Sequence, residues 1–369
     1  MSDNPRFIMI GGFLGAGKTT TIARIARHYQ SLGKRVGIVT NDQATDLVDT
    51  NLLRAQGFDV GEVAGSCFCC NFDALTSTME RLGESQLPEI VIAEPVGSCT
   101  DLVATVVRPL QSVYTRRFDI APYGVILKPS HGLRILRGSS KGGFSPQAEY
   151  IFRKQIEEAD FILVNRIDEL AEASIQELES LLKLHFPNTP SLRISATTGQ
   201  GFEGLYEYLE LQGEFGQKTM DVDYDVYAVG EAELGWLNAQ ANLQSETPMK
   251  LDEFVLAFLN RVQLSLNERS AEVAHLKVIG MSDGNYAVAN LVSSHSDAQL
   301  SIGSGISTKN ANLVVNARVA CDPESLTENI KKTLQTVCVE FGVTLTINTL
   351  QSFRPGRPVP THRMIGTQP

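Results

Sequence analysis

The stretch that decides the fold is "RFIMIGGFLGAGKTTTIARIA", residues 6–26. It begins with an apolar run typical of a buried strand and ends with apolar residues spaced along one face of a helix. Between them, residues 12–19 match the pattern G-x-x-x-x-G-K-[ST]. Glycines at these positions let the backbone wrap phosphate groups with its N–H donors, and the start of the helix adds a positive dipole. The sequence therefore predicts a loop that binds nucleotide phosphates.

The side chains of this loop have predictable roles. Lys18 would reach the β and γ phosphates, and the Thr19 hydroxyl would bind Mg²⁺, so both are candidate catalytic residues. A chance glycine turn is the alternative, but the strand before the loop and the helix after it argue against that. The predicted contacts to nucleotide in this loop are Gly12, Gly15, Ala16, Gly17, Lys18, Thr19 and Thr20.

The first two hundred residues alternate between short apolar runs and amphipathic segments. Runs that are apolar throughout and separated by helices indicate a parallel sheet covered on both faces, with ligands at the carboxyl ends of its strands. We therefore predict an α/β domain, a P-loop nucleoside triphosphatase with a mostly parallel sheet, over residues 1–212. Its strands are expected at 6–12, 35–41, 89–94, 123–128, 161–165 and 192–195.

The pattern changes near residues 211–222, which we interpret as a linker. Residues 222–353 predict a smaller α+β domain, and residues 354–369 an extended tail rich in proline and arginine. The tail side chains Arg354, Arg357, His362 and Arg363 would contact a partner or an anion, or be solvated. The expected elements of the second domain are a strand within 225–236, a helix over about 248–267, a hairpin over 275–292, a polar loop at 301–310, a strand at 313–320, a helix after 321–325 and a strand at 343–350.

A second motif, "FILVNRID" at residues 161–168, indicates which base is bound. Asn165 and Asp168 follow a buried strand in a variant of the N-K-x-D box of GTPases. An aspartate carboxylate can accept from both N1–H and the 2-amino group of guanine, and adenine offers no such pair of donors.

Arg166 replaces the usual lysine of this box, and its aliphatic stem can lie along the base. Ser195 and Ala196 resemble the second loop that contacts the base in GTPases. A capped turn is the alternative, but the order of the motifs favours GTP.

Two further positions concern the γ-phosphate. Glu94 ends the strand "EIVIAE" (89–94), where a carboxylate can hold Mg²⁺ through water or position the attacking water, so it is a third candidate catalytic residue. Gly97 would let the following loop approach the γ-phosphate. In "VTNDQATD" (39–46), Asp42 is the best candidate for a residue that senses the nucleotide, ahead of Asp46. A solvated loop aspartate is the alternative for each.

Three of the six cysteines lie within "GSCFCCNFD", residues 65–73. Cys67 and Cys69 would point the same way in an extended segment, and Cys70 would sit at a helix N-terminus, where the dipole lowers the pKa of a thiol. Three thiolates suit Zn²⁺ or Cu(I), with water, a partner's side chain, Cys99 or a histidine as the fourth ligand. A redox pair and buried inert thiols are the alternatives. Cys321 and Cys338 are expected to be core residues.

The composition excludes some functions. A net charge of −10, with no long Lys/Arg run, argues against a nucleic-acid partner. No apolar window approaches the length of a membrane-spanning helix, and the start lacks a secretory signal pattern, so we expect a cytoplasmic protein with no membrane partner.

The phosphate loop, cysteine cluster, carboxylate strand and guanine box occur in an order that resembles the CobW/HypB/UreG family of metallochaperone GTPases, with the CobW-type branch the closer match over about residues 6–210. The resemblance implies a slow GTPase that binds Zn²⁺ or a related transition metal at Cys67, Cys69 and Cys70 and couples GTP to metal delivery or cofactor assembly. Ser66, which separates Gly65 from Cys67, departs from the family pattern. The metal and the client protein stay open, and a homodimer is one option.

Two other functions fit parts of the sequence. A P-loop small-molecule kinase would use the same phosphate loop but has no need of a guanine box. A regulatory protein that responds to GTP and to thiol state, without significant turnover, would use both motifs and hydrolyse little.

Overall fold

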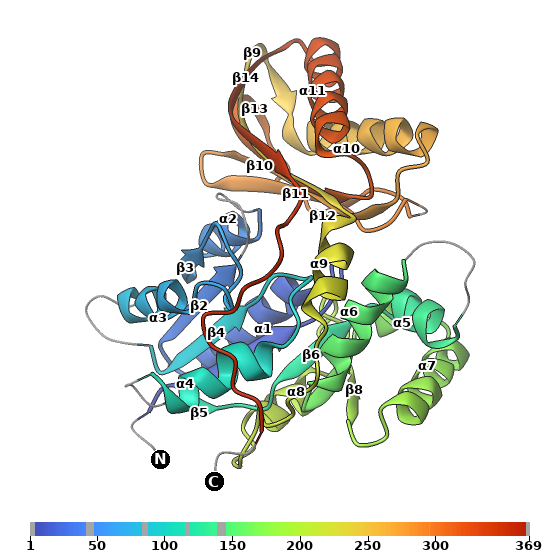
Figure 1. The fold of residues 1–369 in the computed structure, drawn as a ribbon. Helices are drawn as coiled ribbons and strands as arrows, with labels where there is room; N and C mark the ends of the chain where they lie inside the picture. Colours follow the sequence, from blue (N-terminus) through green and yellow to red (C-terminus); the bar gives the residue numbers. More distant parts are fainter. Residues whose placement is uncertain are drawn as a thin grey trace. The chain divides into compact units, whose positions relative to one another are not determined.

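The computed structural model describes residues 4–41, 48–82, 88–114, 118–138, 145–294 and 296–366. The chain divides into two compact units. The first comprises residues 1–43, 58–230 and 357–369, and the second comprises residues 44–57 and 231–356. Figure 1 shows the elements of both units.

The first unit is built on a parallel sheet, as predicted. Its strands follow the order β3-β2-β4-β1-β6-β7-β8, with the short β5 also pairing with β1. All paired neighbours run parallel, and every residue of β1, β2 and β4 is buried, which matches the apolar runs that make up most of each strand. The strands are β1 (Arg6–Gly11), β2 (Val36–Asn41), β3 (Asp59–Val63), β4 (Ile90–Glu94), β5 (Asp119–Ile120), β6 (Gly124–Leu127), β7 (Phe161–Val164) and β8 (Ser191–Arg193).

Helices connect these strands and cover the sheet (Figure 1). In the helix that follows the phosphate loop, Ile22, Ile25, Ala26 and Tyr29 are buried on one face, as their spacing predicts. The helices of this unit are α1 (Lys18–Ser31), α3 (Phe72–Arg81), the π-helix η1 (Val103–Val107), α4 (Arg108–Ser112), α5 (Pro129–Leu136), α6 (Pro146–Glu157), the 3₁₀ turn η2 (Ile167–Glu169), α7 (Glu172–His185) and α8 (Phe202–Leu209).

The six predicted strands are present, each within two residues of its expected ends. Sequence reasoning missed β3 and β5. The sequence of β3, "DVGEV", contains a glycine and two acids, which are poor strand formers, and it lies at the edge of the sheet. With only two residues, β5 is too short to show any periodicity.

The second unit is an antiparallel sheet with the order β12-β11-β10-β13-β9-β14. Between β10 and β11, Asp283 and Gly284 both have positive φ (48° and 77°), which is the tight hairpin turn that the Asp-Gly pair predicts. Two helices pack on one face of the sheet and form the main apolar core with it. The elements are β9 (Gly235–Lys250), α10 (Leu251–Glu268), β10 (Val273–Ser282), β11 (Asn285–Leu291), β12 (Gln299–Ile302), β13 (Ser307–Val319), α11 (Pro323–Glu340) and β14 (Val343–Phe353).

The segment between β2 and β3 belongs to this second unit. In α2 (Val48–Ala55), Val48 and Leu52 pack with Ile279, Val288 and Val314, and Asp49 forms an ion pair with Lys277. Since Ile279 alternates with the core residues Leu276 and Val278, α2 lies on the opposite face of the sheet from α10 and α11. No sequence pattern predicted this packing.

Two predictions for the second half of the chain are wrong. The strand expected within 225–236 is the helix α9 (Tyr224–Ala232), followed by β9 from Gly235. Its valines and tyrosines favour a strand locally, and tertiary packing, with Tyr227 fully buried, overrides that preference. The polar loop expected at 301–310 contains the end of β12 and the start of β13, because strands of an antiparallel sheet tolerate polar residues where they face solvent.

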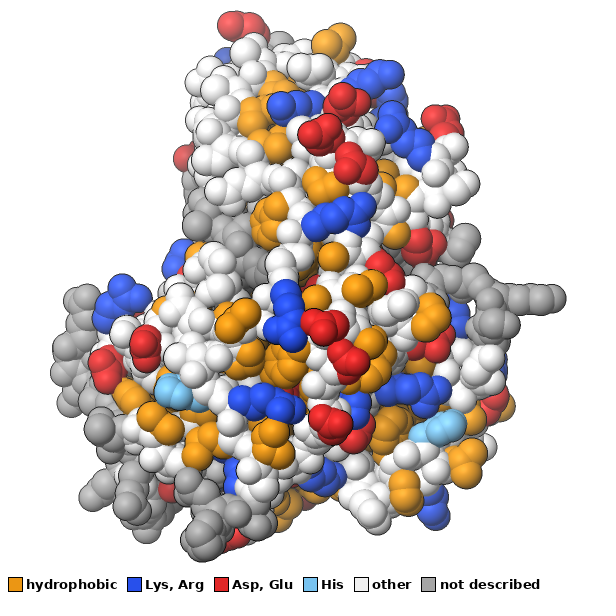
Figure 2. All heavy atoms as spheres, in the orientation of Figure 1, with side chains coloured by type: hydrophobic (Ala, Val, Ile, Leu, Met, Phe, Trp, Pro, Cys, Tyr) orange, Lys and Arg blue, Asp and Glu red, His pale blue; other side chains and the backbone are white. Residues whose placement is uncertain are grey.

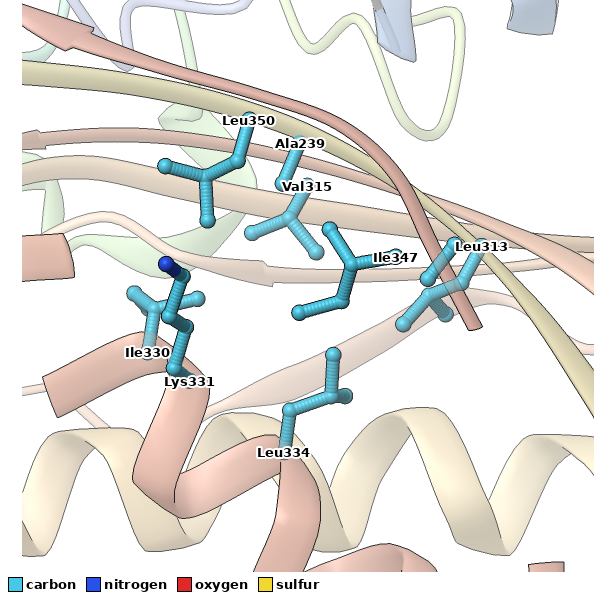
Figure 3. A pocket seen from close by; sticks show the side chains of 9 residues that line it. Ala239, Leu313, Val315, Ile330, Lys331, Leu334, Ile347 and Leu350 are labelled. Carbon is cyan, nitrogen blue, oxygen red and sulfur yellow. The ribbon is translucent and has the colours of Figure 1, made fainter. Parts of the chain in front are cut away.

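Three features of the described residues bear on function. A small gap between the sheet and α11 is lined by aliphatic side chains and Lys331 (Figure 3), so it is part of the core packing. No described helix has the length and apolar character needed to cross a membrane. On the face drawn in Figure 2, the coloured acidic and basic side chains are interspersed, without a broad patch of one sign.

Candidate nucleotide and metal site

The phosphate loop lies between β1 and α1, at the carboxyl edge of the sheet. A Cβ atom at Gly12 would lie 2.1 Å from the Ile126 carbonyl oxygen, and one at Gly17 would lie 2.4 Å from Nδ2 of Asn165. Both glycines have positive φ, 136° and 100°. The loop therefore needs glycine for its backbone conformation and also for its close contacts.

The three candidate catalytic residues come together below this loop. The Lys18 ammonium donates to the Gly12 carbonyl oxygen at 2.9 Å, and the Thr19 hydroxyl donates to Oε1 of Glu94 at 2.9 Å. All three side chains are buried. Glu94 reaches Thr19 because β4 is the parallel neighbour of β1 in the sheet. A buried hydroxyl beside a buried carboxylate is an oxygen pair of the kind that hard cations such as Mg²⁺ bind.

The loop after β4 lies against the same group at Gly97, whose approach to the γ-phosphate stays a prediction. A Cβ atom there would lie 2.8 Å from Cδ2 of Leu14 and 2.9 Å from the Lys18 Nζ. A side chain at this position would displace the ends of the Leu14 and Lys18 side chains and would crowd the Leu14 backbone nitrogen at 3.1 Å. The proposed sensing residue Asp42, and the less favoured Asp46, lie outside the described residues.

The predicted guanine box is positioned by Asn165. Its Nδ2 donates to the Ala16 carbonyl oxygen at 2.8 Å, and its Oδ1 accepts from the Ala196 N–H at 2.9 Å. Asn165 thus ties the phosphate loop to the second predicted base loop. That loop is further fixed by Ser195, whose hydroxyl oxygen accepts from the Thr198 N–H. These contacts explain why Asn165 itself is buried.

The two neighbouring box residues differ from Asn165. Asp168 is exposed, so its carboxylate is accessible to a ligand. Arg166 has a left-handed backbone (φ 60°) and forms an ion pair with Glu169 at 3.1 Å. In this conformation the guanidinium of Arg166 is held by Glu169, a contact that sequence reasoning did not predict.

The three clustered cysteines form a compact group, and their sulfur atoms lie within 4.8 Å of one another. The Sγ–Sγ distances are 2.9 Å from Cys67 to Cys69, 3.1 Å from Cys67 to Cys70 and 3.7 Å from Cys69 to Cys70. Cys67 and Cys69 are buried and Cys70 is partly exposed. Three sulfurs on one corner offer a soft donor set that suits Zn²⁺ and Cu(I).

A short turn at residues 67–71 and the side chain of Asn41 hold the cysteine cluster in place. The N–H groups of Cys70 and Asn71 both donate to the Cys67 carbonyl oxygen, and Asn71 caps α3 by accepting from the Ala74 N–H. Asn41, at the end of β2, accepts from the Phe68 N–H at 2.8 Å and donates to the carbonyl oxygens of Val63 and Ser66. The sequence did not lead us to predict a role for Asn41, although a polar residue at the end of an apolar strand, as in "VTND", indicates a position near a site.

The pKa expectation for Cys70 is wrong. Cys70 does lie just before the first turn of α3, but the hydrogen bond with Cys67 raises the pKa of the Cys70 thiol to about 11. The pKa of the Cys69 thiol is raised as well, first by its hydrogen bond with Cys67, then by those with Cys70 and Cys99, and by burial. Packing three thiols together therefore outweighs the helix dipole. Because metal ligands must be thiolates, metal binding at this corner would release protons.

Cys99 connects the two halves of the site. It is buried, hydrogen-bonds to Cys69, and lies two residues after Gly97. Gln155 of α6, which is also buried, donates through Nε2 to the carbonyl oxygens of both Gly97 (3.0 Å) and Cys99 (2.8 Å). The loop that leaves β4 thus touches Lys18 at one end and the cysteine cluster at the other. No sequence motif predicted the role of Gln155.

These features define a P-loop nucleotide-binding domain that carries a cluster of thiols beside the loop that follows β4. The family model of the CobW/HypB/UreG nucleotide-binding domain matches residues 6–192, just over half of the chain. The protein belongs to the CobW/HypB/UreG family, as its motifs indicated.

Individual relatives agree with this assignment. The chain is 27% identical to the zinc chaperone YeiR of Escherichia coli over 177 residues, which are 46% of this chain and 49% of that protein. It is 35% identical to the zinc chaperone CobW of a Sinorhizobium species over 97 residues, which are 24% of this chain and 27% of that protein. The matches thus span about half or less of these curated relatives.

Solved structures with a similar fold include HypB from Helicobacter pylori in complex with nickel (15% identity, TM-score 0.40, covering 56% of this chain and 86% of that one). Zn(II)-bound YjiA GTPase from E. coli is another (15% identity, TM-score 0.38, covering 90% of this chain and 99% of that one). The small-molecule kinase and the regulator without turnover are not favoured by the family match.

Proposed function

We propose that this protein is a metallochaperone that binds GTP with Mg²⁺, binds Zn²⁺ or a related transition metal at Cys67, Cys69 and Cys70, and uses slow GTP hydrolysis to time delivery of the metal to a client protein. The observation that carries the proposal is the loop from Glu94 to Cys99, which contacts the phosphate machinery and the thiols. A change at the γ-phosphate would move Gly97, and Cys99 would move with it through their shared contact with Gln155.

The residues around the phosphate loop fit Mg²⁺ and a triphosphate. Thr19 and Glu94 would hold the ion, whose charge would neutralise the phosphate oxygens, while Lys18 would turn from the Gly12 carbonyl oxygen to the β and γ phosphates. The backbone N–H groups of residues 12–19 would cradle the phosphates. Proteins that lack a full catalytic set for this reaction turn over on the order of 10⁻² s⁻¹ or more slowly, which suits a timer.

Guanine selection is assigned to Asp168. Its exposed carboxylate is accessible to the N1–H and 2-amino donors of the base, and Asn165 fixes the loops on either side. The variant Asp168→Asn would replace one of the two acceptor oxygens by an NH2 donor, which opposes a donor of the base, and should bind GTP about 10²-fold more weakly, since a site built to pair polar groups rejects a partner that leaves them unpaired. Unchanged competition between GTP and ATP in this variant would contradict the assignment.

The coupling itself is tested by titrating reduced protein with Zn²⁺, first without nucleotide and then saturated with Mg²⁺ and a non-hydrolysable GTP analogue. We expect the Zn²⁺ affinity to change by about tenfold or more, which is about 1.4 kcal/mol of coupling, with the same factor for GTP by reciprocity. Zinc binding that ignores the nucleotide would leave a structural zinc site. Two results together would reject the metal function. The wild type would bind Zn²⁺ no more tightly than micromolar, and its Zn²⁺ affinity would stay the same when the three cysteines are replaced by serine.

A further inference from the structure

The segment 357–366, which we call the strap, runs along the cysteine cluster although it lies nearly three hundred residues away in the chain. The Val359 N–H donates to the sulfur of Cys70 at 3.3 Å, and the Thr361 N–H donates to the carbonyl oxygen of Cys69 at 2.8 Å. The ring of His362 packs edge-on against Phe72, with centroids 5.2 Å apart. The strap therefore contacts three of the four residues from Cys69 to Phe72.

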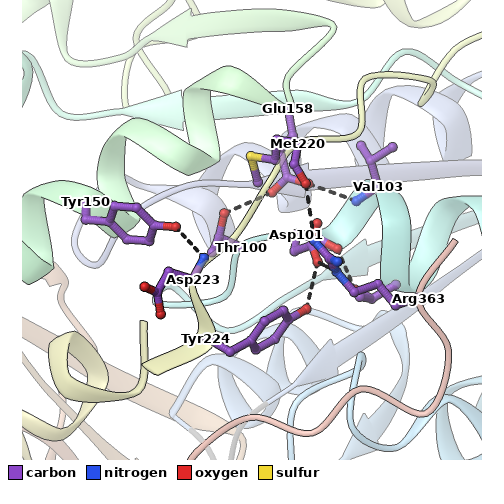
Figure 4. A network of polar contacts seen from close by, with 10 residues as sticks. Thr100, Asp101, Val103, Tyr150, Glu158, Met220, Asp223, Tyr224 and Arg363 are labelled. Atoms are coloured by element: carbon purple, nitrogen blue, oxygen red, sulfur yellow. Dashed lines mark hydrogen bonds and ion pairs between the residues drawn. The ribbon is translucent and has the colours of Figure 1, made fainter. Parts of the chain in front are cut away.

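An ion pair between the half-buried Arg363 and the buried Asp101 fixes the strap (Figure 4). The Arg363 Nε donates to Oδ2 of Asp101 at 2.6 Å, and Tyr224 donates its hydroxyl to the same oxygen at 2.7 Å. Arg363 also donates to the Met220 carbonyl oxygen and lies over the Tyr224 ring. Asp101 is 1% exposed and holds a left-handed backbone (φ 63°), a strained conformation for a residue with a side chain.

The charge around Asp101 explains why an arginine is needed there. Glu158 is fully buried nearby, and burial first, then the charge of Asp101, raise the pKa of its carboxyl group. Two buried acids side by side are costly unless a cation or a proton neutralises them. Arg363 supplies that cation from the strap, so the strap is anchored by an interaction whose loss would leave a buried carboxylate unpaired.

Access to the thiols depends on this arrangement. The side chains of Cys67 and Cys69 are 3% and 1% exposed, so an ion cannot reach them unless something moves. Among the residues that the structure describes, the elements beside them are the end of β2 at Asn41, α3, the loop after β4, and the strap, which has no helix or strand of its own. An extended segment without internal hydrogen bonds opens more readily than a helix or a buried loop.

We propose that the strap is part of the metal site, covering the cysteine cluster and controlling entry and release of the metal, with Arg363 and Asp101 as the positioning pair that keeps it closed. This deepens the proposed function and rests on it for the identity of the metal. Asp101 lies four residues after Gly97, on the same loop that contacts Lys18, so the closing contact belongs to the segment that would respond to nucleotide.

The test compares two arginines of the same strap. Arg363→Gln removes the buried pair, and the matched control Arg357→Gln removes an exposed pair with Asp225, in which the two side chains are 54% and 82% exposed. Both arginines lie over Tyr224. The first readout is the rate at which iodoacetamide alkylates each cysteine of the reduced full-length chain, resolved by mass spectrometry. The second is the rate at which Zn²⁺ passes to a chromogenic chelator.

In Arg363→Gln we expect alkylation of Cys67, Cys69 and Cys70 and the transfer of Zn²⁺ to accelerate by about tenfold or more, because the buried pair is lost. In Arg357→Gln both rates should stay within about threefold of the wild type, as for other exposed pairs. Arg363→Lys keeps the charge and should restore most of the protection. Equal rates in the wild type and in both glutamine variants would overturn the proposal.

Two results separate this proposal from other causes. If Cys338, in the core of the second unit, accelerates together with the cluster, Arg363→Gln has unfolded the chain, and the milder Tyr224→Phe then decides. In that variant a rise confined to the cluster supports the strap, and no rise rejects it. Failure of every variant to bind Zn²⁺ would count against the proposed function alone, because alkylation reports on the strap without metal.

Discussion

The phosphate loop and the cysteine cluster are both short motifs, yet they are built in different ways. The loop owes its shape to glycines within residues 12–17 and to the strand and helix that flank it. The cluster takes its thiols from residues 67–70, but its surroundings come from Asn41, Cys99 and the strap. A site made of backbone can be recognised from local sequence, whereas a site made of distant side chains can be recognised only in part.

The largest effect should come from Cys69→Ser, which removes one thiol of the cysteine cluster. Cys69 is the most buried thiol of the cluster and contacts both of the others. Losing one of three soft ligands should weaken Zn²⁺ binding by about 10³-fold, whereas GTP binding in the absence of metal should change by less than about twofold. Competition with a chelator measures the first and fluorescence of a labelled GTP measures the second.

The matched control is Cys338→Ser, which alters a buried cysteine in the core of the second unit. It should lower thermal stability without changing Zn²⁺ affinity. Equal losses of Zn²⁺ affinity in the two variants would show that the cluster is not the metal site.

The next largest effect is expected beside the phosphate loop, at Gly97. In Gly97→Ala the new methyl group would lie 2.8 Å from Cδ2 of Leu14 and 2.9 Å from the Lys18 Nζ, so the side chains of Leu14 and Lys18 must shift and the loop after β4 must draw back from the phosphate loop. We expect GTP to bind about 10²-fold more weakly, as when one precise charge contact is lost. Gly204→Ala is the control, because a methyl group added there would meet no atom within 4 Å and the residue sits inside α8, where alanine is favoured. Normal GTP binding by Gly97→Ala would mean that this loop does not approach the phosphates.

Much of the first unit could be predicted from sequence because its signals are local. The apolar strands, the G-x-x-x-x-G-K-[ST] loop and the spacing of Ile22, Ile25 and Tyr29 each follow from short-range geometry. The contact between Thr19 and Glu94 was also predictable, since Glu94 ends one strand, Thr19 follows the loop that leaves another, and the two strands were expected to be parallel. The cluster of three thiols followed from their spacing.

The remaining features depend on contacts between distant parts of the chain. Nothing near Arg363 in the sequence points to Asp101, and nothing near Gln155 points to Gly97. The pKa of Cys70 was wrongly predicted because a single-helix argument omits the neighbouring thiols. The helix α9 was mistaken for a strand because local preference for β structure lost to burial of Tyr227. These outcomes were decided by packing, which a single sequence does not display.

A third variant tests whether the two sites communicate. Gln155→Leu would keep the volume of the buried side chain and remove its two hydrogen bonds to the carbonyl oxygens of Gly97 and Cys99. Each site should still bind its ligand, but the tenfold effect of the GTP analogue on Zn²⁺ affinity should fall to about threefold or less. The exposed Gln176→Leu on α7 is the control and should keep the full effect. Coupling that survives in Gln155→Leu would mean that another route connects the sites.

The smallest effect concerns Glu158, the buried acid beside the closing pair of the strap. Burial raises the pKa of its carboxyl group, so the folded chain keeps a proton that the unfolded chain releases above about pH 4.3. The stabilising contribution of this proton is complete below that pH and is lost as the pH rises toward the folded pKa.

Glu158→Gln cannot titrate and keeps an oxygen to accept from the Val103 N–H. Its unfolding free energy should therefore fall less between pH 5 and pH 8, by about 1 kcal/mol or more, in urea titrations at both values. The neighbouring Glu157→Gln, which removes a partly exposed pair with Lys154, should leave the wild-type pH dependence in place. If both variants follow the wild type, Glu158 is ionised in the folded protein, and Arg363 neutralises both acids.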